Sequence, residues 1–175
     1  MVRALLPVAA LALALPAPAR AGELFGALLT QGTLRPLSAD IGARGAALQL
    51  GWRSKRIAAL APVGAPQAHA FGSLNTKGGT DFITGGLSWR LGGRVYFRPG
   101  IGLAVHNGRI PGYAEDGSRA DLGSRLLFEP ELAVGVGTGP VAVELAWAHL
   151  SHATIFSDQN DGLDMIGLRV SLRLP

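Results

Sequence analysis

The chain has 175 residues, of which 48% are hydrophobic and 16% are charged, with a formal net charge of +4 and no cysteine. This length fits one domain, the lack of cysteine excludes a disulfide framework, and the absence of a dense Lys/Arg run argues against nucleic acid as a partner. The charged fraction is low for a soluble domain, so part of the surface is expected to meet something other than water.

The N-terminus has the pattern of a secretory signal peptide. A basic tripeptide is followed by an apolar run over residues 4–15 and by a segment that ends in Ala-x-Ala at Ala21. We predict a signal peptide over residues 1–21, cleavage before Gly22, and one domain over residues 22–175. The alternative, an uncleaved membrane anchor, is disfavoured because the apolar run is shorter than the ~18–20 residues of a membrane helix.

The first half of the predicted domain alternates between apolar and polar residues with period two, which indicates β-strands. In chain order, residues 23–33 are a weak strand candidate, residues 43–53 a clear one and residues 57–71 a weak one. Two further clear strands follow over residues 81–91 and 94–105, and the Gly-Gly pair between them predicts a hairpin turn.

The second half shows the same alternation more regularly. Strands are predicted over residues 126–136, 141–151 and 165–175, with a Gly-Thr-Gly-Pro turn between the first two. In each of them bulky aliphatic side chains occupy one face, and glycine or ionic residues occupy the other. The total is therefore eight strands.

Strands of ~9–11 residues with one apolar and one polar face suit a tilted membrane barrel. The polar faces carry both signs of charge, which a closed lumen could pair: Arg90, Arg94, Arg98, Glu129, Glu131, Glu144, Arg169 and Arg173. We predict an all-β fold, an eight-stranded antiparallel transmembrane β-barrel exported to the bacterial outer membrane. The alternative is a soluble antiparallel barrel or sandwich, in which the same alternation would bury the apolar face.

One stretch near the C-terminus combines residue types that support acyl chemistry. His149 and Ser151 are two positions apart on a predicted strand, so both side chains point to its apolar face, and an imidazole in reach of a hydroxyl can take its proton. Asp164 is in phase with the apolar face of the next strand. These groups are expected to meet at one rim of the lipid-facing wall, where the carboxylate would orient the imidazole. The alternative is a polar strand end in the head-group zone.

This stretch resembles the lipid A 3-O-deacylase family. The similarity rests on His149-x-Ser151, on Asn160-Asp161-Gly162, on the carboxylate of Asp164, and on residues 99–104 and 122–129, which are similar to the family's later strands. It covers residues 94–174, and the N-terminal half agrees in length and strand pattern. The resemblance implies an eight-stranded outer-membrane esterase that releases a 3-hydroxyacyl chain from lipid A.

The resemblance also implies roles for single residues. Ser151 corresponds to the nucleophile, His149 to the base, and Asp164 to the carboxylate that orients the base. The family has Glu at that last position, so Asp164 is one methylene shorter, and His152 stands where the family has Asn. The oxyanion is expected to be stabilised by Asn160 or by backbone N–H groups near Ala153 and Thr154.

Two histidines, His69 and His106, lie outside this constellation, and the sequence has no HExxH motif or paired His/Cys spacing, so no metal or other cofactor is expected. The expected partners are lipid A or lipopolysaccharide and the outer membrane, with a homodimer left open. Two other functions remain as alternatives. One is a non-enzymatic small barrel with a structural or adhesive role, and the other is an esterase or acyltransferase with a different lipid substrate.

Overall fold

A computed structural model describes residues 22–32, 45–108, 122–156, 158 and 160–175. The predicted signal peptide over residues 1–21 lies outside these residues. The strands are β1 (Gly22–Gln31), β2 (Ala46–Arg56), β3 (Gln67–Asn75), β4 (Phe82–Ser88), β5 (Leu91–Gly92), β6 (Val95–His106), β7 (Leu126–Thr138), β8 (Val141–Leu150) and β9 (Leu163–Arg173), and a 3-10 segment, η2 (Ala58–Val63), separates β2 from β3. Among the described residues, no helix is long and apolar enough to cross a membrane.

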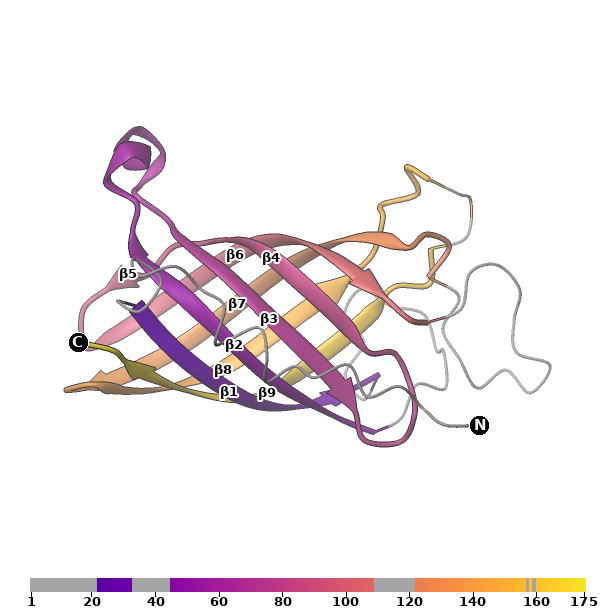
Figure 1. Ribbon diagram of the computed structural model, residues 1–175, viewed down its shortest axis with the longest axis horizontal. Helices are drawn as coiled ribbons and strands as arrows, with labels where there is room; N and C mark the ends of the chain where they lie inside the picture. The colour runs from indigo at the N-terminus through magenta and orange to yellow at the C-terminus, as the bar shows by residue number, and fades with distance from the viewer. Residues whose placement is uncertain (1–21, 33–44, 109–121, 157, 159) are drawn as a thin grey trace.

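The strands form one closed antiparallel barrel (Figure 1). Sequence neighbours pair with one another, β1 pairs with β9, and β4 pairs with β6 to complete the ring. The two-residue strand β5 pairs with β6 next to β4, so β4 and β5 act as one interrupted strand and the barrel has eight. The predicted all-β, eight-stranded antiparallel barrel is confirmed. Closure pairs the strand edges that an open sheet would leave exposed.

The apolar face of the barrel points outward. Leu28, Ile83 and Leu168 are 57–59% exposed on the outer wall, whereas Arg98 and Arg169 are fully buried inside. A soluble barrel would reverse this arrangement and bury its aliphatic residues. An outward apolar belt around a polar interior is the arrangement of a transmembrane barrel, so the soluble alternative is wrong.

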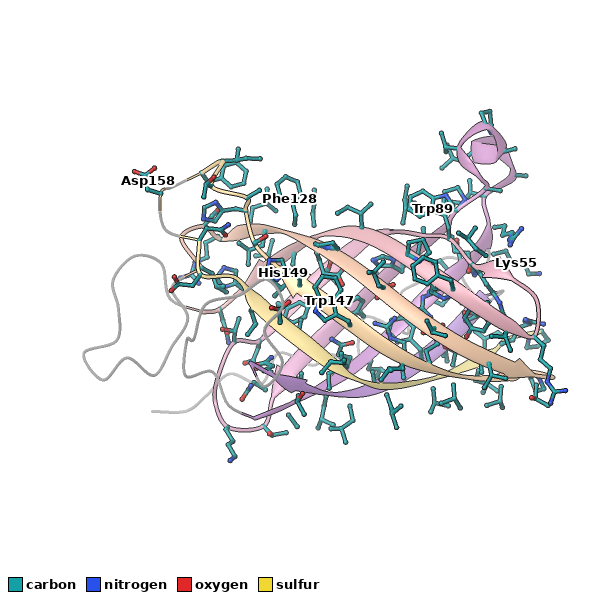
Figure 2. All side chains as sticks on the ribbon, turned by 180° about the vertical axis from the view of Figure 1, so that it is seen from behind. Lys55, Trp89, Phe128, Trp147, His149 and Asp158 are labelled. Carbon is teal, nitrogen blue, oxygen red and sulfur yellow. The ribbon has the colours of Figure 1, made fainter. Side chains whose placement is uncertain are left out.

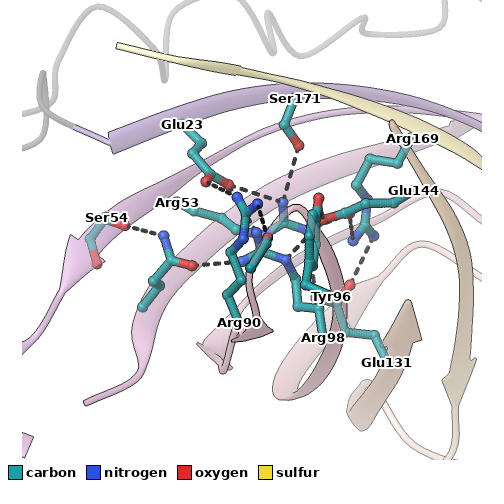
Figure 3. A network of polar contacts seen from close by, with 12 residues as sticks. Glu23, Arg53, Ser54, Arg90, Tyr96, Arg98, Glu131, Glu144, Arg169 and Ser171 are labelled. Atoms are coloured by element: carbon teal, nitrogen blue, oxygen red, sulfur yellow. Dashed lines mark hydrogen bonds and ion pairs between the residues drawn. The ribbon is translucent and has the colours of Figure 1, made fainter. Parts of the chain in front are cut away.

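Much of the interior is a network of charged side chains (Figure 3). Arg98 donates from Nε to Glu144 Oε1 at 2.9 Å and from Nη2 to Glu23 Oε2 at 3.1 Å, and Arg169 donates from Nη2 to Glu131 Oε2 at 2.8 Å. Buried charges are tolerated where they are paired. The lumen therefore pairs positive with negative side chains, as the alternation predicted.

The two rims of the barrel differ in their connections. The rim where the described chain begins also holds its C-terminus, because Leu174 N–H donates to the Gly22 carbonyl at 2.7 Å. The two-residue turn between β7 and β8 lies there too. At the opposite rim the paired strands are farther apart in the sequence, because 19 residues separate β6 from β7 and 12 separate β8 from β9. Because outer-membrane barrels have short periplasmic turns and longer extracellular loops, we name these the inner rim and the outer rim.

The prediction of a strand over residues 57–71 is wrong for residues 57–66. The chain leaves β2 after Arg56, forms η2, and joins the sheet again only at Gln67. Pro62 lies inside η2 and Pro66 directly precedes β3. Proline has no N–H to donate to a ladder, so this uncharged segment could not pair along its length although its composition suits a strand.

Candidate active site

The hairpin of β8 and β9 brings a histidine and a carboxylate together at the outer rim. His149 and Asp164 are directly opposite one another in the antiparallel register. His149 Nδ1 lies 3.0 Å from Asp164 Oδ1, and both residues are buried. β9 begins at Leu163, two residues earlier than predicted, and this extension places Asp164 inside the ladder. Their meeting was predicted from strand parity, and the register confirms it.

Trp147 also holds this carboxylate, a contact that the sequence analysis did not predict. Its Nε1–H donates to Asp164 Oδ1 at 3.0 Å, and its indole stacks on the His149 imidazole with ring centroids 6.1 Å apart and planes 15° apart. Figure 2 shows Trp147 and His149 side by side on the barrel wall. The available signal was parity, because Trp147 precedes His149 by two positions on the same face.

Gly162 lies close to the Cε1–Nε2 edge of the His149 imidazole. Its φ of +67° lies in the left-handed region, which favours glycine. A Cβ at this position would lie 2.7 Å from His149 Cε1 and 3.2 Å from His149 Nε2. The glycine of the Asn-Asp-Gly motif is therefore needed both for the turn and for the space that the imidazole occupies.

The backbone of Ser151, two residues after His149, is held by Phe128 of β7. It forms an isolated antiparallel bridge with Phe128, in which Ser151 N–H donates to the Phe128 carbonyl at 3.1 Å and Phe128 N–H donates to the Ser151 carbonyl at 2.7 Å. Among the described residues, no hydrogen bond joins Ser151 Oγ to His149. Because Nδ1 faces Asp164, Nε2 is the imidazole nitrogen left for a hydroxyl proton. Such bonds often tighten only when substrate binds.

The turn after Ser151 has an unusual backbone. Ala153 and Thr154 have φ values of +51° and +58°, a conformation that non-glycine residues rarely adopt and that is enriched at functional sites. Asn160 Oδ1 accepts a hydrogen bond from His152 N–H at 3.1 Å, so this side chain holds the turn. The structure brings all three residues predicted to stabilise an oxyanion next to Ser151 in the loop, and their role stays a prediction.

The other histidines are placed away from this carboxylate. His152 is buried in the loop, where its Nδ1 accepts from Phe156 N–H at 3.5 Å and its ring packs on Phe156. His106 Nε2 lies 2.6 Å from the Ser124 carbonyl oxygen, and His69 Nε2 lies 3.7 Å from Glu129 inside the barrel. Across the described part of the chain, no three His, Asp or Glu side chains are grouped to hold a metal ion.

A transmembrane barrel with a His–carboxylate pair beside a serine at one rim defines a class, the small membrane-embedded hydrolases. The family model described as lipid A 3-O-deacylase (PagL) matches residues 39–173, so the chain belongs to this family. The crystal structure of the outer membrane enzyme PagL is similar in fold, with a TM-score of 0.64 and 19% sequence identity over 87% of this chain and 99% of that one. No curated protein matches the chain.

Proposed function

We propose that this protein is a lipid A 3-O-deacylase that hydrolyses the ester at the 3-position of lipid A and releases a 3-hydroxy fatty acid. The observation that supports this most directly is the 3.0 Å contact between His149 Nδ1 and Asp164 Oδ1 at the outer rim. His149 lies two residues before Ser151 on the same strand end. Family membership supports the substrate class. Lipid A lies in the outer leaflet, and side chains on the outward face of a barrel are reached from that leaflet.

The proposed mechanism is acyl transfer through Ser151. Asp164 holds the Nδ1–H of His149, which leaves Nε2 to take the Ser151 proton as Oγ attacks the ester carbonyl. The tetrahedral intermediate collapses, its C–O bond to lipid A breaks, and the imidazolium returns the proton to the lipid A hydroxyl. Water, deprotonated by His149, then attacks the acyl-enzyme, and Ser151 leaves with the proton as the free 3-hydroxy acid departs.

Aspartate can take the place of the family's glutamate because of the strand register. His149 and Asp164 are a directly opposed cross-strand pair, and such pairs bring their Cβ atoms to within ~5.5 Å of each other. A short side chain spans that distance. The second hydrogen bond, from Trp147, fixes the carboxylate that the shorter side chain presents. This geometry supports Asp164 as the residue that positions the base.

The oxyanion site is proposed to lie in the turn that follows the nucleophile. The left-handed conformations of Ala153 and Thr154 orient consecutive backbone N–H groups differently from those of a strand, and such groups can form a concave anion site. Asn160 supports the same turn through its bond to His152 N–H. Export through a signal peptide over residues 1–21 and assembly as a homodimer remain predictions.

The test is to measure lipid A by mass spectrometry in cells that express Ser151→Ala or His149→Ala. Each variant should stop the release of 3-hydroxy fatty acid, since each removes a group that reacts or moves the proton. Thr138→Ala, which removes an exposed hydroxyl at the inner rim, is the matched control and should retain activity. Heat-dependent gel mobility verifies that every variant is folded. Full activity in either site variant would exclude this mechanism.

The same measurement separates the alternatives. A structural or adhesive barrel leaves lipid A unchanged when the wild-type chain is expressed. An esterase or acyltransferase with another lipid substrate leaves lipid A unchanged but alters the phospholipids in the same extracts.

A further inference from the structure

The connection between β2 and β3 differs from the other connections at the inner rim. Residues 57–66 separate these strands, whereas two residues separate β7 from β8. The segment contains no charged or strongly polar side chain. Val63 is 58% exposed, and most of η2 is exposed beside it. Short turns are usual at this rim of an outer-membrane barrel, so an exposed apolar connection requires an explanation.

This segment projects sideways from the barrel. Figure 1 shows it rising from the wall near β5, across the direction in which the barrel is longest, and Figure 2 shows the same from behind. The wall from which it rises is the apolar belt that faces lipid. The segment therefore extends over the lipid next to the wall, at the level of the inner rim, and does not extend along the axis into the periplasm.

The segment has a defined conformation of its own. Its two ends are joined where Ile57 N–H donates to the Pro66 carbonyl at 2.8 Å, and its tip is closed where Ala65 N–H donates to the Leu60 carbonyl at 2.9 Å. An exposed apolar surface held in a fixed shape is characteristic of a contact surface.

A tryptophan connects this segment to the neighbouring wall. Trp89 Nε1–H donates to the Val63 carbonyl at 2.7 Å, and a Cβ at Gly64 would lie 3.1 Å from Trp89 Cδ1. Trp89 directly follows β4, at the inner rim. Tryptophan is enriched at the level of the lipid head groups in membrane proteins, so the position of Trp89 indicates the depth at which the segment lies.

Basic side chains flank the segment. Lys55 and Arg56 precede it and are exposed. Together with Arg90 and Arg173 they line a cavity of about 220 Å³ at the inner rim, where Glu23 is the one acid among the described lining residues. Cations at a membrane surface attract anionic phospholipid head groups. The charge at this rim is thus complementary to a leaflet that contains phosphatidylglycerol.

We propose that residues 57–66 form an interfacial anchor that inserts into the periplasmic leaflet of the outer membrane, while Lys55 and Arg56 contact anionic phospholipid head groups. Continuity with the lipid-facing belt, sideways projection and the adjoining cations favour lipid over a second copy of the chain or a periplasmic protein. Such an anchor sets the depth of the barrel, and thereby the height of the outer rim in the opposite leaflet.

The absence of native cysteine permits a direct test. A nitroxide is attached at Ala61→Cys in the otherwise intact chain, which is reconstituted in vesicles of phosphatidylcholine with phosphatidylglycerol. Oxygen should relax this label more strongly than a water-soluble nickel complex does. The control is Gly93→Cys in the β5–β6 turn of the same rim, where a Cβ meets nothing within 4 Å, and it should show the reverse preference. A water-accessible label at Ala61→Cys would overturn the proposal, as would spin–spin broadening between copies.

A second measurement tests the head-group contact. The Ala61→Cys label should lie deeper as the phosphatidylglycerol content rises, and Lys55→Gln with Arg56→Gln should abolish that dependence. Lys77→Gln removes an exposed cation from the outer rim and should leave it unchanged. No dependence on phosphatidylglycerol in the parent label would exclude the anionic contact. Deacylation enters neither readout, so the failure of this proposal and that of the proposed function are distinguishable.

Discussion

The two ends of the barrel use polar residues in opposite ways. Toward the inner rim, charged side chains such as Arg98 and Glu144 point inward, pair with one another and fill the lumen. At the outer rim, His149 and Asp164 occupy the strand face that elsewhere carries aliphatic residues. A polar group in the lumen follows the alternation of the strand, whereas a polar pair on the lipid-facing register departs from it. Such departures are expected at functional sites.

The largest expected effect tests the outer pair itself. Asp164→Asn keeps the shape of the side chain but stabilises the wrong imidazole tautomer, so kcat should fall by about 10⁴-fold, as the same change does in the Ser-His-Asp triad of a serine protease. Asp164→Glu keeps the negative charge and introduces the residue that the family has at this position, so this variant should retain most of the activity. Lipid A turnover by purified, folded protein measures both. Equal activity of Asp164→Asn and the parent would mean that the pair is only structural.

A smaller loss is expected from Gly162→Ala. The new methyl group would occupy space within 2.7 Å of His149 Cε1, and a displaced base costs about 10²-fold in rate. Gly139→Ala is the matched control, because Gly139 has a similar φ of +61° but open space around its Cβ position. The two variants should suffer the same backbone strain and differ only in activity. If both variants lost activity to a similar extent, backbone strain would explain the effect.

Trp147→Phe should have a modest effect. It preserves an aromatic ring against His149 and removes only the N–H donor to Asp164. One hydrogen bond is worth about 1 kcal/mol, or roughly fivefold in rate. A positioning role predicts that kcat falls while KM is unchanged, and steady-state kinetics separates the two. A change confined to KM would instead indicate that Trp147 contacts the acyl chain.

The lumen should show the reverse behaviour, with a loss of stability and almost none of activity. Glu144→Gln removes the charge that faces Arg98 at 2.9 Å and Arg53 at 3.5 Å, and breaking a buried pair costs about 3–5 kcal/mol. Tyr96→Phe, which removes one neutral donor to Glu144, should cost about 1 kcal/mol. Thermal unfolding, monitored by gel mobility, measures the loss of stability in each variant. A fall in activity per folded molecule would show that the two ends are coupled.

The alternation of residues predicted the strands and their faces because a barrel wall repeats one rule along its length. It predicted that His149 and Asp164 would share a face, which needs only parity. The contacts of Trp147 and Gly162 require the exact cross-strand register, and a slip of one residue would reverse every side chain. Parity within a strand does not contain that information.

Two other features lay beyond the sequence pattern for different reasons. The bond between Arg98 and Glu23 crosses the lumen between strands that are not neighbours, so no local pattern encodes it. The segment over residues 57–66 has the apolar composition of a strand, but Pro62 and Pro66 prevent ladder pairing. Composition alone therefore predicts a strand where the two prolines exclude one.

The candidate active site depends on the pairing of β1 with β9, the first and last strands of the barrel. Asp164 is carried by β9, and the free edge of β9 is covered only when β1 pairs with it from Glu23 to Gln31. The same event brings Glu23 to Arg98 inside the barrel. An incompletely inserted chain would therefore lack both its internal charge balance and the support of the hairpin that carries the candidate site, so we expect hydrolytic activity only once the barrel has closed.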